Sequence, residues 1–333
     1  MNNIEILDCT LRDGGHVNNS KFGYNTIVDI VSGLSRANVN YVEMGFLING
    51  TFTKDHSSCN DVDEMSSRIL AENERETKYT AMIRPDWYDI SQLSEEKQKV
   101  DIIRFAFYYR DFDLMKKYAE IVRKRNYGVI CNPVNIMGYS EDTLKELVAR
   151  INDLQPMQLT MVDTYGSLTF DALHRIYTII EENLNSNIKI GLHLHENKSM
   201  AMGLLNEFLN IRNKDRKVVI DASLLGMGRM PGNLCIELLV SYLNSVYGTN
   251  YNELEIYKLI SKYIEPLKRE HMWGYDPAYA ISAQLNMHRS YAEYLLEKKV
   301  TLVDIYRVLN SIPTELRDEF HRDYIEKIIL GCR

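Results

Sequence analysis

The sequence predicts an α/β fold, namely a (β/α)8 TIM barrel with a C-terminal helical extension. Eight short apolar runs rich in β-branched residues recur roughly every 20 to 35 residues, amphipathic stretches separate them, and the strand pattern stops after about residue 248. Such alternation is typical of a parallel sheet covered by helices, and eight units in about 245 residues match a barrel. An open, doubly wound sheet is the alternative, but its usual GxGxxG turn is replaced here by RDGGH.

The expected strands follow one another along the first three quarters of the chain. They lie at residues 4–10, 41–46, 79–83, 101–107, 128–134, 158–163, 189–195 and 218–224. Between them, residues 25–38, 112–126 and 141–154 place apolar side chains at helical spacing. Ser140, with Thr143 three residues later, predicts an N-cap for the last of these helices.

The end of the chain has a different pattern. We expect residues 1–248 to form the barrel domain and residues 249–333 a helical annex rich in tyrosine. The expected helices lie at residues 251–270, 277–299, 301–312 and 314–330, with a break at the WGYDP stretch. The tyrosines considered are Tyr275, Tyr279, Tyr291 and Tyr294. We expect them to pack the annex onto the barrel, and a docking surface for a partner is the alternative.

Composition excludes several classes of function. The 333 residues carry a formal net charge of −7, which argues against nonspecific nucleic-acid binding. The five cysteines are widely spaced and form no CxxC pair, so neither a disulfide framework nor a thiolate zinc site is indicated. The N-terminus lacks the pattern of a signal peptide, and no apolar run approaches ~20 residues. We therefore expect a cytoplasmic protein with no membrane or nucleic-acid partner.

Polar side chains gather where the expected strands end. In a barrel of this kind the active site lies at the C-terminal ends of the strands. The residues found there are Arg12, Asp13, His16, Glu43, Asp163, Thr164, His193, His195, Arg229 and Asn233. The third and fourth strand ends offer mainly Arg84 and Arg110, which would either bind an anionic part of a substrate or be solvated.

The sharpest of these signals is the HLH stretch on the seventh strand. Positions i and i+2 of a strand face the same way, so His193 and His195 can both reach one cation at ~2.0–2.2 Å. The alternative is one hydrogen-bonded core histidine and one incidental one. Strands 1 and 7 flank strand 8 in a barrel, so Asp13 can meet the pair. This ligand set also serves non-haem iron oxygenases, whereas an Asn233 oxygen favours magnesium or manganese.

Three motifs together resemble the DRE-TIM metallolyase family. LDCTLRDG, GLHLHEN and GMGRMPGN occur in the expected order between residue 4 and about residue 245. The family contains 4-hydroxy-2-oxovalerate aldolases, hydroxymethylglutaryl-CoA lyases, and isopropylmalate or homocitrate synthases. The resemblance implies a divalent metal, Mn²⁺ or Mg²⁺, held by Asp13, His193 and His195, with Asn233 matching a metal-ligating asparagine seen in some branches.

The resemblance also implies roles for other residues. Arg12 matches the arginine that stabilises a developing enolate, Glu43 lies where several members carry a functional glutamate, and Thr164 matches a hydroxyl near the substrate carboxylate. His16 matches a histidine proposed as the catalytic base of the aldolases. Each residue also has a simpler interpretation. Arg12 can form an ordinary ion pair with Asp13, and Glu43 can be the structural partner of a basic group inside the barrel. Thr164 can be a turn residue, and His16 can be a solvent-exposed histidine of a turn.

His16 and the glycine-rich stretch favour the aldolase branch. The thioester lyases of the family carry a cysteine in the glycine-rich loop after the eighth strand. Residues 224–234 contain none, so the resemblance counts against a hydroxymethylglutaryl-CoA lyase. We therefore expect a class II aldolase that acts on a 4-hydroxy-2-oxo acid and yields pyruvate, or a related 2-oxo acid, and an aldehyde. The helical tail resembles the C-terminal region of the aldolases, which can contact a partner dehydrogenase. Formation of a homo-oligomer through these helices is the alternative.

Three other readings stay open. The first is a synthase of the same family that condenses an acyl-CoA with a 2-oxo acid. The second is a partner-dependent or non-catalytic subunit with the tail as its docking surface. A metal-dependent hydrolase is the weakest, because barrel hydrolases usually carry HxH on the first strand.

Overall fold

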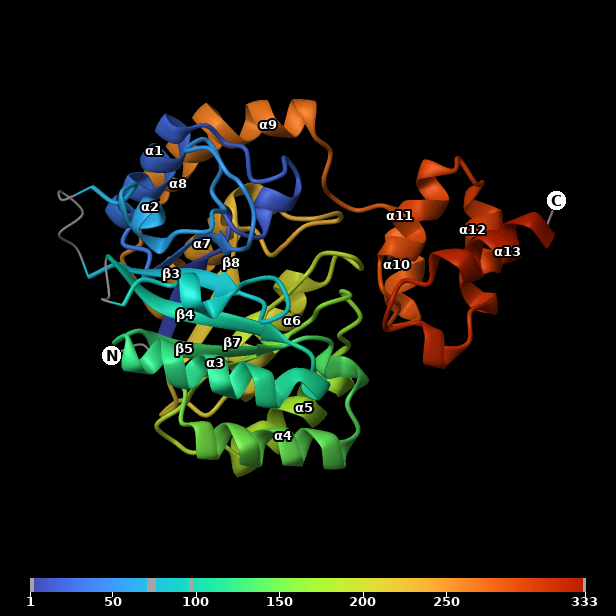
Figure 1. Ribbon diagram of the computed structural model, residues 1–333, viewed down its shortest axis with the longest axis horizontal. Helices are drawn as coiled ribbons and strands as arrows, with labels where there is room; N and C mark the ends of the chain where they lie inside the picture. The colour runs from blue at the N-terminus through green and yellow to red at the C-terminus, as the bar shows by residue number, and fades with distance from the viewer. Residues whose placement is uncertain (1–2, 71–75, 96–98, 332–333) are drawn as a thin grey trace.

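The computed structural model describes residues 3–70, 76–95 and 99–331. Eight parallel strands close into a barrel in chain order, with the last paired to the first (Figure 1). They are β1 (Ile4–Asp8), β2 (Tyr41–Leu47), β3 (Lys78–Ile83), β4 (Val100–Phe107), β5 (Gly128–Pro133), β6 (Gln158–Val162), β7 (Lys189–His193) and β8 (Val218–Ala222). The predicted (β/α)8 TIM barrel is confirmed, and the open sheet is wrong.

Helices surround the barrel. They are α1 (Tyr24–Arg36), α2 (Val62–Ser66), α3 (Phe112–Lys124), α4 (Glu141–Leu154), α5 (Phe170–Asn183), α6 (Ala201–Ile211) and α7 (Ile236–Tyr247). Short 3-10 turns are η1 (Gly14–His16), η2 (Ile90–Gln92), η3 (Tyr109–Asp111), η4 (Ile136–Gly138), η5 (Leu224–Gly226) and η7 (Thr314–Leu316). The expected N-cap of α4 is confirmed, because the Ser140 hydroxyl accepts the Thr143 amide at 3.1 Å.

The barrel interior is built in layers, as the period of two along each strand requires. A small apolar cluster fills its lower part and comprises Leu7, Cys9, Tyr41, Ile102, Ile130 and Val219. Two positions further along four of these strands stand polar residues that are also buried: Glu43, Arg104, Asn132 and Asp221. The strand period therefore places a polar layer directly above an apolar one, toward the C-terminal ends of the strands.

A bulge in β2 directs a further side chain of this strand, Phe46, toward the cavity. The pairing of β2 with β3 shifts register between Glu43 and Phe46. Gly45 lies within the shift at φ +150°, and a Cβ there would meet the Ser57 carbonyl oxygen at 2.4 Å. Glu43 lies before the bulge and faces inward by the strand period, and because a bulge re-aims the side chains that follow it, Phe46 lines the cavity.

The C-terminal helices divide between two cores. Helix α8 (Glu253–Leu259), a π-helical turn (Ile260–Ile264) and α9 (Glu265–Glu270) pack on the barrel side, where the core includes Ile256, Ile264 and Trp273. Helices α10 (Pro277–Gln284), α11 (Ser290–Glu297), α12 (Leu302–Ser311) and α13 (Arg322–Gly331) share a second core and form a separate body beside one end of the barrel (Figure 1). The domain boundary expected after residue 248 stays a prediction.

Two helices expected in the annex are interrupted. The helix predicted at residues 277–299 ends at Gln284 and a new helix begins at Ser290. Asn286 adopts the left-handed conformation (φ +46°) and its side-chain oxygen accepts the Ser167 hydroxyl of the barrel at 2.7 Å, so a tertiary contact overrides the helical pattern. The helix predicted at residues 314–330 begins only at Arg322.

The tyrosines of the annex do not pack it onto the barrel as expected. Tyr279, Tyr291 and Tyr294 are buried in the core of the annex itself. Tyr275 is 62% exposed. These side chains therefore stabilise the helical body, and its contacts with the barrel are made by other residues.

Within the described residues, no helix is long and apolar enough to cross a membrane. The four cysteines that fall in this part of the chain, Cys9, Cys59, Cys131 and Cys235, are free thiols. Cys332 lies outside the described residues.

Candidate metal centre and active-site cavity

The first candidate ligand is presented by the turn that follows β1. The backbone amides of Arg12 and Asp13 both donate to the Cys9 carbonyl, at 3.2 and 2.8 Å, and the 3-10 turn η1 begins directly afterwards. A Cβ on Gly14 would lie 3.1 Å from the Met227 side chain, so glycine permits close packing against the loop after β8. Asp13 is thereby held over the middle of the barrel mouth, facing the end of β7.

The two histidines of the HLH stretch present the same ring nitrogen to Asp13. His193 Nδ1 lies 3.1 Å from Asp221 Oδ2, and His195 Nδ1 lies 2.8 Å from the Asp163 backbone carbonyl. Because both partners accept hydrogen bonds, each histidine carries its proton on Nδ1. The Nε2 lone pairs then point toward Asp13 Oδ2, at 3.9 Å for His193 and 3.5 Å for His195.

Three hydrogen-bond acceptors therefore face one another without a proton between them. Ligand atoms of Asp13, His193 and His195 lie within 4.8 Å of one another, and Asp13 Oδ2 is buried with no hydrogen-bond donor among the described residues. Burial would raise the pKa of Asp13, but the Arg12 guanidinium holds it well below its usual range, so the carboxylate is ionised. This arrangement fits a cation, and the outward-donating Nδ1 atoms are the usual support of metal-bound histidines.

Asn233 lies next to this group. It forms an isolated antiparallel bridge with His195, and its side-chain amide donates to the Met227 carbonyl at 3.0 Å. Its Oδ1 atom is buried and has no donor within the described part of the chain. An unsatisfied buried oxygen costs free energy unless something binds it, so Asn233 is also compatible with a ligand role.

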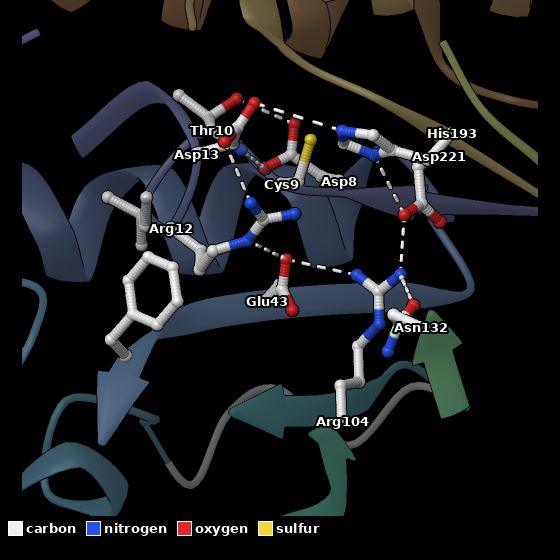
Figure 2. Close-up of polar contacts among 12 residues, drawn as sticks. Asp8, Cys9, Thr10, Arg12, Asp13, Glu43, Arg104, Asn132, His193 and Asp221 are labelled. Carbon is white, nitrogen blue, oxygen red and sulfur yellow. Dashed lines mark hydrogen bonds and ion pairs between the residues drawn. The ribbon is translucent and has the colours of Figure 1, made fainter. Parts of the chain in front are cut away.

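The candidate ligands belong to a closed ring of buried charged side chains, which we call the charge ring (Figure 2). Arg12 bridges Asp13 and Glu43 at 2.8 and 2.7 Å, and Arg104 bridges Glu43 at 3.0 Å and Asp221 at 2.5 Å. His193 closes the ring between Asp221 and Asp13. The members are Arg12, Asp13, Glu43, Arg104, His193 and Asp221, and none is more than 7% exposed.

The charges of this ring do not cancel. Three carboxylates meet two guanidinium groups, which leaves one excess negative charge when His193 is neutral. Burial lowers the pKa of His193, which keeps it neutral, and Arg104 outweighs burial in lowering the pKa of Asp221. Because a buried unpaired charge is costly, a bound cation would offset this excess negative charge.

The charge ring forms the floor of a cavity of about 240 Å³. Of the residues predicted for the site, His16 and Thr164 lie on its wall together with Arg12, Asp13 and the two histidines. The His16 ring packs on the Phe46 ring, with 5.5 Å between the ring centroids, and the His16 side chain is 29% exposed. Shielding from water and the nearby guanidinium groups lower the pKa of His16, although Asp13 opposes them, so the ring is neutral at pH 7.

Thr164 and Glu43 occupy different positions with respect to this cavity. Thr164 Oγ1 accepts a hydrogen bond from the backbone N–H of Asn135 at 2.7 Å. The hydroxyl proton of Thr164 is therefore available to donate into the cavity. Glu43 is fully buried between Arg12 and Arg104 and does not line the wall. The glutamate can therefore act on a bound molecule only through the arginines that it holds.

Of the two arginines expected at the third and fourth strand ends, only one reaches the cavity. Arg84 lines it and forms a two-point ion pair with Asp86, at 3.0 and 2.7 Å. Arg110 does not line it, and its side chain pairs with Glu319 of the annex.

Sequence reasoning missed several residues of the site. Arg104, Asn132 and Asp221 stand inside apolar strands, and a charged residue within a buried run was the available signal for two of them. His288 and Arg289, from the annex, also line the cavity. They lie in the interruption between α10 and α11, within a stretch whose pattern predicted a continuous helix, so the sequence contained no clear sign of their position.

Comparison with known proteins agrees with the fold and the motifs. The family model described as HMGL-like matches residues 3–261. The chain is 24% identical over 238 residues to an oxaloacetate decarboxylase of Mycobacterium tuberculosis, covering 72% of this chain and 69% of that protein. It is 22% identical over 321 residues to a 4-hydroxy-2-oxovalerate aldolase of Moorella thermoacetica, covering 91% of each.

Among solved structures, the N-terminal domain of a putative aldolase from Bacteroides vulgatus superposes with a TM-score of 0.77. It shares 22% identity and covers 91% of this chain and 99% of its own, so this likeness shows a common fold. Together with the family match, it confirms the resemblance drawn from the three sequence motifs.

Proposed function

The chain belongs to the HMGL-like family, and we propose that it is a divalent-metal-dependent class II aldolase. The reaction is cleavage, or formation, of the C3–C4 bond of a 4-hydroxy-2-oxo acid, with pyruvate or a related 2-oxo acid and an aldehyde as products. The observation that carries this proposal is the meeting of three unprotonated ligand atoms of Asp13, His193 and His195 beside the fixed guanidinium of Arg12. Several relatives named 4-hydroxy-2-oxovalerate aldolase support it.

The metal would be held by Asp13, His193 and His195, with Asn233 as a fourth ligand. When bound, it would supply Lewis-acid polarisation of the 2-oxo carbonyl. The oxygen atoms of Asp13 and Asn233 favour Mn²⁺ or Mg²⁺ over softer ions.

Arg12 provides the fixed positive charge that the reaction needs. Cleavage moves an electron pair toward the 2-oxo oxygen, and a preorganised cation beside that atom lowers the barrier. Glu43 accepts from Nε and Asp13 from Nη1, so the guanidinium cannot rotate away. Glu43 is thus a positioning residue that acts through Arg12, and it does not itself touch substrate.

His16 is the proposed general base. Its neutral ring takes the proton of the 4-hydroxyl, the C3–C4 bond breaks, and C4 becomes the aldehyde carbon. The electron pair is left on the three-carbon fragment as an enolate, which then takes a proton at C3 to give the 2-oxo acid. The hydroxyl of Thr164 would donate to the substrate carboxylate, and the backbone N–H of Asn135 holds that threonine by a hydrogen bond to its Oγ1 atom.

Decarboxylation of oxaloacetate is the second candidate. It produces the same pyruvate enolate, with carbon dioxide in place of the aldehyde, and the Mycobacterium tuberculosis relative bears that name. It would use Arg12 and the metal ligands but would not need His16 as a base. Condensation of an acyl-CoA with a 2-oxo acid stays an alternative. Release of a thiol when acetyl-CoA is supplied would reveal it.

Oligomerisation through the annex and a partner dehydrogenase are parts of this proposal that follow from the family resemblance. A cytoplasmic location is a further part, which rests on the widely spaced cysteines of the sequence. The annex is compatible with the first two, because α12 exposes Leu302, Val303 and Tyr306 on one side.

Product analysis tests the proposed function. The protein, supplied with Mn²⁺ or Mg²⁺, is incubated with 4-hydroxy-2-oxopentanoate or with oxaloacetate, and the products are identified by mass spectrometry. We expect pyruvate and acetaldehyde from the first compound, and loss of this activity after treatment with a chelator. Carbon dioxide from oxaloacetate without any aldol cleavage would favour the second candidate. Unchanged cleavage by protein stripped of metal would contradict the proposal.

A further inference from the structure

The outer part of the cavity is electrically different from its floor. It is lined by Arg229, from the loop after β8, and by His288 and Arg289, from the interruption between α10 and α11. The two guanidinium groups of this wall face the charge ring across the space where a substrate would lie. The two guanidinium groups share one carboxylate, that of Glu293, so this wall carries one excess positive charge.

The shared carboxylate is engaged mainly by one of the two arginines. Arg229 forms a two-point pair with Glu293 at 3.0 and 2.7 Å, and the Ser290 hydroxyl donates to the same carboxylate at 3.1 Å. Arg289 Nε lies 3.7 Å from Glu293 Oε1, which is too long for a hydrogen bond. The guanidinium of Arg289 is thus a cation in a largely enclosed place with a weak partner, since its side chain is 17% exposed.

This weak pairing separates Arg289 from the other arginines of the cavity. Within the described residues, four of the cavity arginines have a carboxylate oxygen within 3.0 Å: Arg12, Arg84, Arg104 and Arg229. Burial and the neighbouring Arg229 together lower the pKa of Arg289 to about 10, although Glu293 and Asp13 oppose them. The guanidinium lines the same cavity as the candidate metal ligands, so an anion bound there would give it a full partner.

We propose that Arg289 binds an anionic group, carboxylate or phosphate, on the aldehyde half of the substrate. This inference rests on the proposed aldolase function. The orientation follows from the lining of the cavity, because His16, Arg229 and Arg289 all lie on its wall. A substrate whose 4-hydroxyl meets His16 and whose 2-oxo acid end meets Arg12 has its C4 substituent directed to the outer wall. Arg289 is therefore a specificity-determining residue that the annex contributes to a site built by the barrel.

The test compares aldol addition of pyruvate to three aldehydes: acetaldehyde, glyoxylate and glycolaldehyde phosphate. For each aldehyde, kcat/KM is measured in the wild type and in Arg289→Gln, because the intrinsic reactivity of the aldehyde cancels in that ratio. We expect a loss of about 10- to 100-fold for the anionic aldehyde that the site accepts, and less than about 3-fold for acetaldehyde. A larger loss with glyoxylate identifies a carboxylate, and a larger loss with glycolaldehyde phosphate identifies a phosphate.

Two further variants control for folding and for charge in general. Arg289→Lys keeps the charge and should retain part of the preference for the anion. Arg307→Gln removes an exposed arginine of the same helical body, on α12, and should change none of the three ratios. Equal losses for all three aldehydes in Arg289→Gln would overturn the inference, because the residue would then serve the shared pyruvate end.

A binding measurement, independent of turnover, uses two non-cleavable 2-oxo acids of equal chain length. Titration calorimetry should show 2-oxoglutarate binding about tenfold more tightly than 2-oxopentanoate in the wild type, with this preference lost in Arg289→Gln. Equal affinities in the wild type would contradict the anion site.

Exchange of the C3 protons of pyruvate with solvent separates failure of this inference from failure of the proposed function. Exchange without any preference for anions would overturn the Arg289 inference alone. Absence of exchange in metal-loaded protein would overturn the aldolase proposal itself.

Discussion

The two walls of the cavity are held in place by different means. On the floor, each side chain of the charge ring is buried, and Arg12, Glu43 and Arg104 are each held between two oppositely charged partners (Figure 2). On the outer wall, Arg229, His288 and Arg289 are partly exposed, and Arg289 has one weak ion-pair partner. The first set stands mainly on strands of a closed barrel, and the second depends on how a separate helical body is placed against it.

This difference suggests a division of labour. Bond cleavage needs charges fixed within a few tenths of an ångström, and a ring whose members hold one another supplies that rigidity. Selection among aldehydes needs only a suitable wall, which a loop between two helices can provide and can change without disturbing the ring. We expect substitutions in the two regions to have effects of different kinds and sizes.

The largest expected effect comes from breaking the ring. Arg104→Met would leave Glu43 and Asp221 without a cationic partner on one side, and removal of one member of a buried ion pair costs about 3–5 kcal/mol of unfolding free energy. The matched change on the outer wall, Arg229→Met, should cost about 0–1 kcal/mol, because that side chain is one-third exposed and Arg289 can take over Glu293. Urea unfolding of both variants measures the difference.

The comparison would fail if the two variants lost similar amounts of stability. A double variant, Arg104→Met with Asp221→Asn, removes one stranded charge and should recover part of the loss. An additive, larger loss in the double variant would show that the two side chains do not form a coupled pair.

A smaller loss of folding stability is expected when the pH is lowered, and it comes from His288 on the outer wall. Burial, together with Arg289 and Arg229, lowers the pKa of His288 to about 4, although Glu293 and Asp318 oppose them. The neutral ring accepts the Ser290 amide at Nδ1, at 3.2 Å, and protonation would remove that hydrogen bond. Since the folded-state pKa is below the unfolded one, this contribution to stability is present above pH 6.5 and is lost between pH 6.5 and 4.

We expect the His288 contribution to be about 1 kcal/mol once its partial exposure is allowed for. Unfolding of the wild type and of His288→Gln at pH 7.5 and pH 5 tests this, and the variant should lose less stability on acidification. His174→Gln, which alters an exposed histidine paired with Glu207, is the control. Identical pH dependence in all three proteins would mean that His288 does not titrate as described.

The barrel was predictable from sequence because its signals are local and repeat. Each strand is an apolar run of five to eight residues, and the HLH motif could be placed on one face by the strand period alone. The meeting of Asp13 with the histidine pair followed from the closure of the barrel, which makes β1 and β7 the neighbours of β8. Residues fixed by periodicity and topology could therefore be named in advance.

The remaining parts of the site depend on contacts between distant segments. The roles of Arg104 and Asp221 require knowledge of which four strands present polar residues at the same level of the barrel. His288 and Arg289 enter the cavity because Asn286 takes a left-handed conformation and contacts Ser167, which overrides a helical pattern. Neither the hydrophobic period nor the spacing of motifs in a single sequence predicts a contact of this kind.

The most direct test of the proposed chemistry separates the formation of the enolate from the cleavage of the bond. Metal-loaded wild type and His16→Gln are compared for exchange of the C3 protons of pyruvate in D₂O and for cleavage of a 4-hydroxy-2-oxo acid. We predict that His16→Gln loses about 10²- to 10⁴-fold in cleavage and much less in exchange, while removal of the metal abolishes both. Equal losses of cleavage and exchange in His16→Gln, or exchange that persists without metal, would contradict the account.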